Sequence, residues 1–136
     1  MIRPNPKRKT SKTNRRRYAD TLWSKYIKAR AQGKCQRCGR YGNALEAAHI
    51  IPRRVLPTRF DVRNGVALCA ATCHRDFDSA ASALLRIQLI IDWIGAQSYE
   101  EMLALARTRW SGDYDTPIKE LGLLLRQHRS IGLKAA

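Results

Sequence analysis

Four cysteines, arranged as two close pairs, constrain the fold of this chain more than any other feature. Two residues separate Cys35 from Cys38, and three separate Cys69 from Cys73. A turn of this kind places two thiolates on one edge of a tetrahedral zinc site. The two pairs predict one structural zinc ion, which a domain this small needs because its core alone stabilises it little. The alternatives are a pair of disulfides or buried free thiols.

The N-terminal sequence bears on the redox state of these cysteines. Residues 1–17 contain no apolar stretch of the kind found in a secretory signal. We therefore expect a reducing compartment, where paired cysteines bind metal more often than they form disulfides. The longest apolar run, residues 66–71, is far too short to cross a bilayer.

Positive charge is concentrated at the front of the chain. The 136 residues include 26 Lys and Arg against 11 Asp and Glu, a net charge of +15, and residues 1–17 hold eight of the basic residues and no acidic one. We predict a disordered basic arm over residues 1–17 and a single domain over residues 18–136. So large a charge favours a polyanionic partner, most simply nucleic acid. An anionic membrane is the weaker option, because no long basic amphipathic helix is evident.

The pattern of apolar residues predicts a small α+β core at residues 34–80. A helix is expected at residues 18–32, ended by Gly33. Short strands are expected at residues 44–51 and 66–68, followed by a helix that starts near Cys69. This order of two strands and a helix is the ββα arrangement.

Residues 81–136 read as a bundle of about three helices. Leucine and isoleucine between residues 84 and 94 give the first helix a broad apolar face, and Gly95 is expected to end it. Residues 98–101 form a capping-box pattern that predicts the start of the second. Thr116 and Pro117 predict the start of the third, and Gly132 its end. We expect these apolar faces to form core.

Three polar residues occupy telling positions around the cysteines. His49 lies between the pairs within the sequence Ala-His-Ile-Ile-Pro, Asn64 precedes the second pair within Asn-Gly-Val, and His74 directly follows Cys73. This combination resembles the HNH nucleases of the ββα-metal superfamily. The resemblance covers residues 34–77.

The resemblance implies a catalytic role for each of the three residues. His49 would be the general base at the end of the first strand, and Asn64 would fix the loop and orient His49 through its amide. His74 would hold a divalent cation, Mg²⁺ or Mn²⁺, with Asp78 as a second ligand one turn further along the helix. The enzyme would then be a metal-dependent endonuclease that hydrolyses phosphodiester bonds in DNA.

The chain departs from the family pattern at two places. HNH proteins with a zinc clamp usually have two residues between the second pair of cysteines, whereas this chain has three. The residue before the base is often a metal-binding Asp or His, and here it is Ala48. The missing ligand places more weight on His74 and Asp78.

Each candidate residue also has a structural interpretation. Asn64 before Gly65 is a common turn former. His74 could be a ligand of the structural zinc, and Asp78 could be the N-cap of the next helix.

Seven arginines are candidates for contact with DNA phosphates. One group lies on the loop that connects His49 to Asn64, and the other lies at the end of the basic arm. The first group is Arg53, Arg54, Arg59 and Arg63, and the second is Arg15, Arg16 and Arg17.

A weaker resemblance extends to the NinG (Rap) recombination proteins of phages, which act on branched DNA. It is carried by Arg59-Phe60-Asp61 and by Arg86-Ile87-Gln88-Leu89-Ile90. It implies a DNA-associated protein in the cytoplasm of a bacterial host, encoded by the host or by a phage, with a role in recombination. The rival classes are a non-catalytic zinc-ribbon protein that binds DNA and an RNA-binding or ribosome-associated zinc ribbon.

Overall fold

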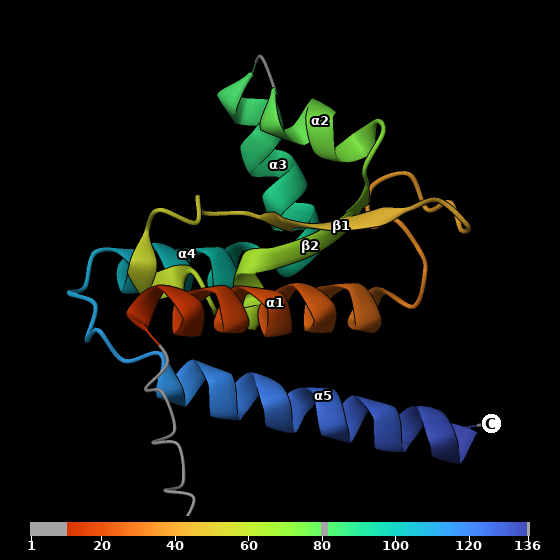
Figure 1. Ribbon diagram of the computed structural model, residues 1–136. Helices are drawn as coiled ribbons and strands as arrows, with labels where there is room; N and C mark the ends of the chain where they lie inside the picture. Colours follow the sequence, from red (N-terminus) through yellow and green to blue (C-terminus); the bar gives the residue numbers. More distant parts are fainter. Residues whose placement is uncertain (1–10, 80–81, 136) are drawn as a thin grey trace, which may run out of the picture.

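The computed structural model describes residues 11–79 and 82–135, and it is a small α+β fold built around a two-stranded sheet (Figure 1). Strands β1 (Leu45–His49) and β2 (Gly65–Cys69) pair antiparallel, with Leu45 opposite Cys69 and His49 opposite Gly65. Every residue of β2 is buried. The predicted ββα core is confirmed, with each strand within two residues of its expected ends.

Helix α1 (Lys12–Ala31) covers one face of the sheet. Its buried residues recur at helical spacing and form a stripe that packs on the sheet: Ala19, Leu22, Trp23 and Ile27. The helix begins at a Ser11 cap, so residues 12–17, expected in a disordered arm, are helical; residues 1–10 lie outside the described part of the chain. At its other end Gln32 and Gly33 both have positive φ, which ends the helix as predicted.

The opposite face of the sheet is covered by three helices: α2 (Cys73–Asp78), α3 (Ala83–Ile94) and α4 (Ala96–Ala106). Phe77, Ile90 and Met102 from these helices are buried against Val66 and Leu68 of β2. The apolar face expected along α3 is buried only in part. Leu84, Leu85 and Ile87 are exposed, because α3 meets the sheet mainly through its second half.

The start of α4 differs from the prediction. Gly95 ends α3 at a φ of 84° and is also the cap of α4, so the chain reverses without a loop. Ser98 therefore lies inside the helix and its capping-box pattern is not used.

Helix α5 (Asp115–Ala135) packs mainly on α1 (Figure 1). Leu121 and Leu125 are its buried contacts in the α1 cluster. The three C-terminal helices are therefore present but do not form one bundle. The helix begins near Pro117 as expected, with Asp113 accepting hydrogen bonds from the Asp115 and Thr116 backbone, and it continues past Gly132.

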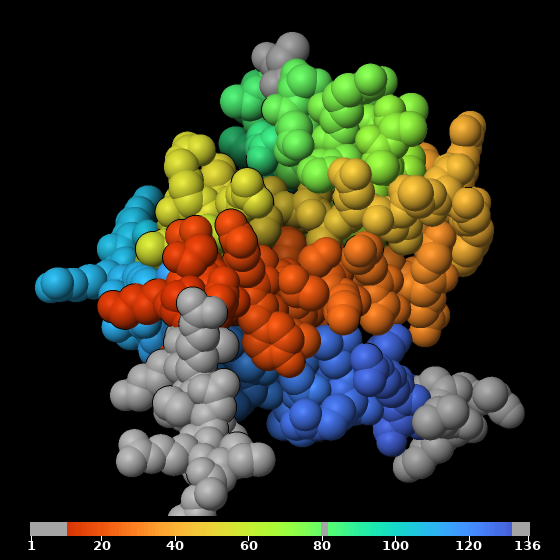
Figure 2. Space-filling model, viewed as in Figure 1, coloured from red at the N-terminus to blue at the C-terminus, as the bar shows by residue number. Residues whose placement is uncertain are grey.

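None of the helices in residues 11–79 and 82–135 has both the length and the apolarity that a membrane span requires. The space-filling view shows α1 (red to orange) packed between the sheet and α5 (blue), with little open space between these layers (Figure 2).

Close contact between α1 and β2 depends on Gly65. A Cβ atom at this position would lie 2.6 Å from side-chain carbons of both Ile27 and Trp23. Since real Cβ contacts are not this short, any larger residue must displace these side chains or push α1 away from the sheet.

Gly65→Ala should therefore destabilise the protein by about 1–3 kcal/mol, the usual cost of overpacking. Gly122→Ala is the matched control, because a Cβ there meets no atom closer than 3.7 Å inside α5. That change should stabilise the helix by about 0.5–1 kcal/mol. Urea unfolding of both variants measures the two effects, and equal stabilities would show that the contact at Gly65 is unimportant.

Candidate metal centre and active site

The four cysteines come together in one cluster. Their sulfur atoms all lie within 4.8 Å of one another, and Cys38 Sγ is 4.0 Å from Cys69 Sγ. Tetrahedral zinc with Zn–S bonds of about 2.3 Å requires sulfur separations of about 3.8 Å. All four thiols are free. The geometry therefore fits one metal ion and excludes the disulfide alternative in this structure.

The additional residue in the second pair lies in a turn ahead of the helix. Cys69 is the last residue of β2, and Cys73 is the first residue of α2. The helix was expected to start near Cys69, and this is wrong by one turn. Both sulfurs still reach the cluster because Ala70 to Thr72 bring the chain around between them.

Polar contacts and burial shift the pKa values of the cluster cysteines in different directions. The Thr72 hydroxyl lies 3.1 Å from Cys69 Sγ and, together with the Cys73 backbone N–H, lowers the pKa of Cys69 to about 6. Burial, followed by the neighbouring Cys69 sulfur, raises the pKa of Cys73 to about 12. For Cys35, burial is outweighed by backbone N–H groups, and its pKa is lowered. A bound metal ion would hold all four as thiolates.

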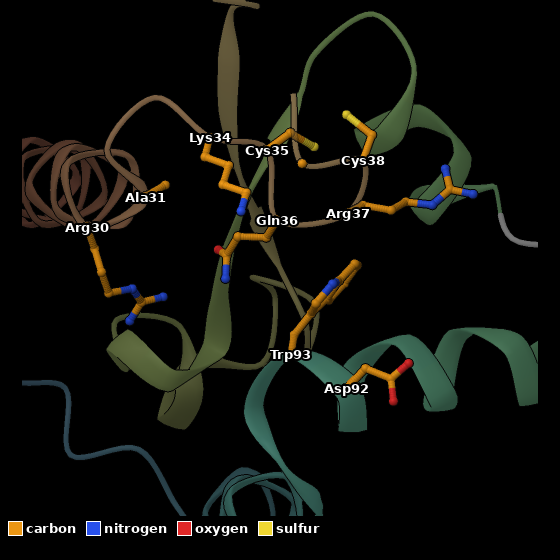
Figure 3. Close-up of a pocket in the computed structure, with 10 residues that line it drawn as sticks. Arg30, Ala31, Lys34, Cys35, Gln36, Arg37, Cys38, Asp92 and Trp93 are labelled. Carbon is orange, nitrogen blue, oxygen red and sulfur yellow. The ribbon is translucent and has the colours of Figure 1, made fainter. Parts of the chain in front are cut away.

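An open cavity of about 600 Å³ adjoins this cluster (Figure 3). Lys34, Cys35 and Cys38 line it from the cysteine turn, and Asp92 and Trp93 line it from α3. Two arginines at its rim are engaged in structural contacts. Arg30 donates to the Val62 and Gly65 carbonyls, and Arg37 pairs with Asp76.

His49 is held at the end of β1 by two contacts. Its ring stacks on the indole of Trp23 with a centroid distance of 3.9 Å and an interplanar angle of 10°. Its Nε2 lies 3.0 Å from the carbonyl oxygen of Arg59, which can only accept, so Nε2 carries the proton. Burial lowers the pKa of His49, so the ring is neutral near pH 7 with its lone pair on Nδ1.

Asn64 fixes the loop between the strands. It is fully buried, and its side-chain oxygen accepts from the Ile51 N–H at 2.7 Å. Its amide nitrogen donates to the carbonyls of Ile51 and Thr58, at 3.0 and 3.1 Å. All three bonds go to the loop backbone, so any effect of Asn64 on His49 passes through the loop and not through a direct contact.

His74 lies between two carboxylates. Its Nδ1 is 2.6 Å from Glu46 Oε2, and its Nε2 is 3.2 Å from Asp78 Oδ2. With a cation bound between Nε2 and Asp78, the proton would lie on Nδ1 and be donated to Glu46. Asp78 is the last residue of α2 and Ser82 is the cap of α3, so the N-cap interpretation of Asp78 is excluded.

His49, His74 and Asp78 line one pocket of about 330 Å³, together with Arg53 and Arg86. Arg86 comes from α3 and is fixed by hydrogen bonds to the Phe77 and Ile50 carbonyls, at 2.7 and 3.3 Å. The pocket thus combines a neutral histidine, an imidazole beside a carboxylate, and two cationic side chains.

Two of the loop arginines predicted to grip DNA have other partners. Arg59 is only 9% exposed and forms a bidentate pair with Asp20 at 2.8 and 2.7 Å. Its charge is therefore neutralised within the protein. Arg63 pairs with Asp61 and Glu101. Arg53 and Arg54 are exposed. In the second group, Arg17 is exposed on α1, Arg16 is half-buried, and Arg15 pairs with Asp115.

Sequence reasoning missed several residues of this site. Glu46 precedes His49 by three positions on a short strand. A carboxylate so close in sequence to a candidate base could have identified Glu46 as a site residue. Trp23 lies within the helix expected at residues 18–32, and nothing in its spacing indicates a ring stacked on His49. Arg86 is likewise brought to the pocket only by the packing of α3.

Residues 35–84 match the HNH endonuclease family, designated HNH_2. This confirms the resemblance drawn from the cysteine pairs, His49, Asn64 and His74 over that segment. No curated protein and no solved structure gave a match. The likeness to the NinG proteins has no support among these findings and stays a prediction.

The cysteine cluster predicts a metal content that can be measured. Purified protein should contain close to one equivalent of zinc by elemental analysis. Cys38→Ser should release the metal and unfold or aggregate the protein, because structural zinc sites contribute a large part of the folding free energy. A folded, soluble wild-type sample without zinc would contradict this assignment.

Proposed function

We propose that the chain is a metal-dependent endonuclease that hydrolyses DNA phosphodiester bonds, and the match of residues 35–84 to the HNH endonuclease family supports this. The observation that carries the proposal is the convergence of His49, His74 and Asp78 on one pocket flanked by arginines. Phosphodiester hydrolysis needs an activated water, stabilisation of charge on the phosphate, and help for the leaving oxygen.

His49 has the properties of the general base. The Arg59 carbonyl holds the proton on Nε2, and burial keeps the ring neutral at pH 7. Nδ1 would accept a proton from water as the water oxygen attacks phosphorus and one P–O ester bond breaks. Because the pKa of His49 lies below its usual value, activity should already be near its plateau at pH 7 and fall as the pH decreases through that pKa.

His74 and Asp78 are suited to hold a divalent cation. The 3.2 Å between His74 Nε2 and Asp78 Oδ2 is close to the roughly 3 Å that separates neighbouring ligands of an octahedral ion bound at about 2.1 Å. Such an ion, Mg²⁺ or Mn²⁺, would supply charge stabilisation for the phosphate and the leaving oxygen. Glu46 would fix the tautomer of His74.

Ala48 stands directly before His49, at the position where HNH proteins often have a metal-binding Asp or His, and Glu46 offers a carboxylate nearby. Ala48 is 1% exposed and packs in the core on the α2 side of the sheet. Glu46 lies two residues earlier on the same strand face and reaches His74. The carboxylate absent at position 48 is thus supplied from position 46, as an orienting group for the metal-binding histidine.

DNA binding is assigned to exposed cations around the pocket and on α1. Arg53 lines the pocket and Arg54 follows it on the same exposed loop. The net charge of +15 provides general affinity for the phosphate backbone. Branched DNA, as implied by the NinG likeness, is one substrate to test beside plasmid and single-stranded DNA.

His49→Ala should abolish Mg²⁺- or Mn²⁺-dependent cleavage of these substrates while leaving zinc content and DNA affinity unchanged. Removal of the base should cost about 10²–10⁴-fold in rate. His128→Ala, on α5, is the matched control and should cut like wild type. If wild-type protein cuts no substrate with any divalent ion, the alternative of a non-catalytic zinc-ribbon protein that binds nucleic acid is favoured.

Glu46→Gln and Asp78→Asn test the two carboxylates at His74, of which Glu46 would orient the histidine and Asp78 would itself be a metal ligand. Loss of a group that orients a metal ligand typically costs 10–100-fold in metal affinity or activity. Both changes should raise the Mg²⁺ or Mn²⁺ concentration needed for half-maximal cleavage and retain the structural zinc. Release of zinc from either variant would show that His74 belongs to the cysteine cluster.

Arg53→Ala and Arg54→Ala should weaken DNA binding and reduce its salt dependence. On duplex DNA, the slope of log affinity against log salt should become shallower by about 0.9 for each phosphate that the variant no longer neutralises. Arg59→Ala should instead destabilise the fold, because it leaves Asp20 unpaired in a partly buried site. Fluorescence anisotropy across a salt series, with thermal unfolding in parallel, distinguishes the two effects. An unchanged slope in Arg53→Ala would remove this residue from the DNA interface.

A further inference from the structure

We propose that α1, which lies outside the matched HNH segment, is part of the active site. Trp23 and Asp20 are positioning residues that hold His49 in one ring orientation and one tautomer, with the proton on Nε2 and the lone pair on Nδ1. The inference rests on the proposed role of His49 as the base. It assigns to a helix that otherwise looks like packing a direct effect on catalysis.

Trp23 sets the plane of the His49 ring. The two rings are nearly parallel at 3.9 Å, and Trp23 is 2% exposed. The indole is itself fixed, because its Nε1–H donates to the Asp61 carbonyl at 3.0 Å. An imidazole stacked on a fixed indole can rotate only by a half-turn about its Cβ–Cγ bond without driving its edge into the indole.

The Arg59 carbonyl selects between the two remaining orientations. In the observed one Nε2 lies 3.0 Å from that oxygen and donates to it. A half-turn of the ring would replace Nε2 by a carbon and lose the hydrogen bond. The carbonyl therefore fixes both the orientation and the tautomer, and Nδ1 is left as the basic nitrogen.

Asp20 fixes the residue that carries this carbonyl. Its carboxylate binds Nε and one terminal nitrogen of Arg59 at 2.8 and 2.7 Å, and the other terminal nitrogen donates to the Arg53 carbonyl at 3.2 Å. A bidentate pair of this kind restricts the arginine strongly. Asp20 and Trp23 are three residues apart on α1, so both restraints come from the same side of the helix.

The position of α1 is itself well determined. Arg30 donates to the Val62 and Gly65 carbonyls at 3.0 and 2.8 Å, and Gly65 permits close contact with Trp23. With the Trp23 bond to Asp61, three hydrogen bonds thus join the helix to the end of the loop between the strands. The helix and the loop therefore move as one unit beside His49.

The charges facing His49 come from the same groups. Burial lowers the pKa of His49 most; the Arg59 carbonyl and the Asp20 charge raise it, and the Arg59 and Arg53 charges lower it. Loss of the Asp20 charge would therefore lower the pKa of His49 further, but the main effect of the change should be on ring orientation.

The test uses the full-length, zinc-loaded protein and the variants Asp20→Asn and Trp23→Phe. Asp20→Asn keeps the shape and removes the charge, and Trp23→Phe keeps an aromatic ring and removes the N–H donor. Asp92→Asn and Trp110→Phe are the matched controls, because the side-chain hydrogen bond of Asp92 is with Gln88 and the ring contact of Trp110 is with Tyr114.

Long-range ¹H–¹⁵N correlation spectra report which imidazole nitrogen carries the proton, and the chain has only three histidines to assign. Wild type and both controls should show His49 protonated on Nε2. Asp20→Asn and Trp23→Phe should show a mixture of tautomers and a fall of about 10–100-fold in kcat at saturating DNA and Mg²⁺, with unchanged zinc content. Asp20→Glu should recover part of the loss.

Folded Asp20→Asn and Trp23→Phe proteins that keep the wild-type tautomer and kcat would overturn the proposal and reduce α1 to a packing element. A wild-type tautomer on Nδ1 would overturn it as well. If the wild-type protein cuts no DNA but the spectra change as expected, the positioning by α1 is supported and the proposed nuclease function fails. The spectra and the cleavage assay therefore test the two ideas separately.

Discussion

The four-cysteine cluster is the constraint on which the geometry of the proposed active site depends. Helix α2 carries His74 and has only six residues, too few to be stable alone in water. Cys73 is its first residue, so the cluster anchors the helix at the point where it leaves the sheet. Cys69 anchors the end of β2, whose partner strand carries Glu46 and His49. A metal ion bound to the cluster would thus fix His74 relative to both residues of β1.

The two histidines of the pocket are controlled in complementary ways. A backbone carbonyl holds the proton of His49 on Nε2, whereas His74 has a carboxylate at each nitrogen, Glu46 at Nδ1 and Asp78 at Nε2. His49 is therefore left with a basic nitrogen at Nδ1, and a cation bound between His74 Nε2 and Asp78 would leave the His74 proton on Nδ1 beside Glu46. The two histidines differ in chemistry because they have different hydrogen-bond partners. The Arg59 carbonyl at His49 is positioned by the loop that Asn64 closes, and the Glu46 carboxylate at His74 comes from β1.

The sequence predicts the features that depend on residues close together in the chain, and it does not predict contacts between distant segments. The cysteine spacing, the strand ends and the three motif residues are local patterns, and they led to the correct α+β core and to the HNH family. Contacts between distant segments were missed, including Trp23 on His49 and Glu46 on His74. Arg59 shows the reason most clearly: its place on a basic loop suggested DNA contact, whereas its bidentate pair with Asp20, 39 residues away, arises only from the packing of α1. Helix α5 likewise packs on α1 because of an apolar stripe whose partner no local pattern specifies.

The acidic residues between positions 18 and 78 all take part in specific ion pairs or hydrogen bonds. Residues 18–78 contain five acidic side chains against eleven basic ones. Each of the five contacts a specific cation or histidine; the pairs are Asp20 with Arg59, Asp61 with Arg63, Asp76 with Arg37, and Glu46 and Asp78 with His74. Three of these acids thus neutralise arginines, and the other two lie at the proposed cation site. The exposed Arg53 and Arg54 beside the pocket are not among these paired arginines, so their charge favours a polyanion over a neutral ligand.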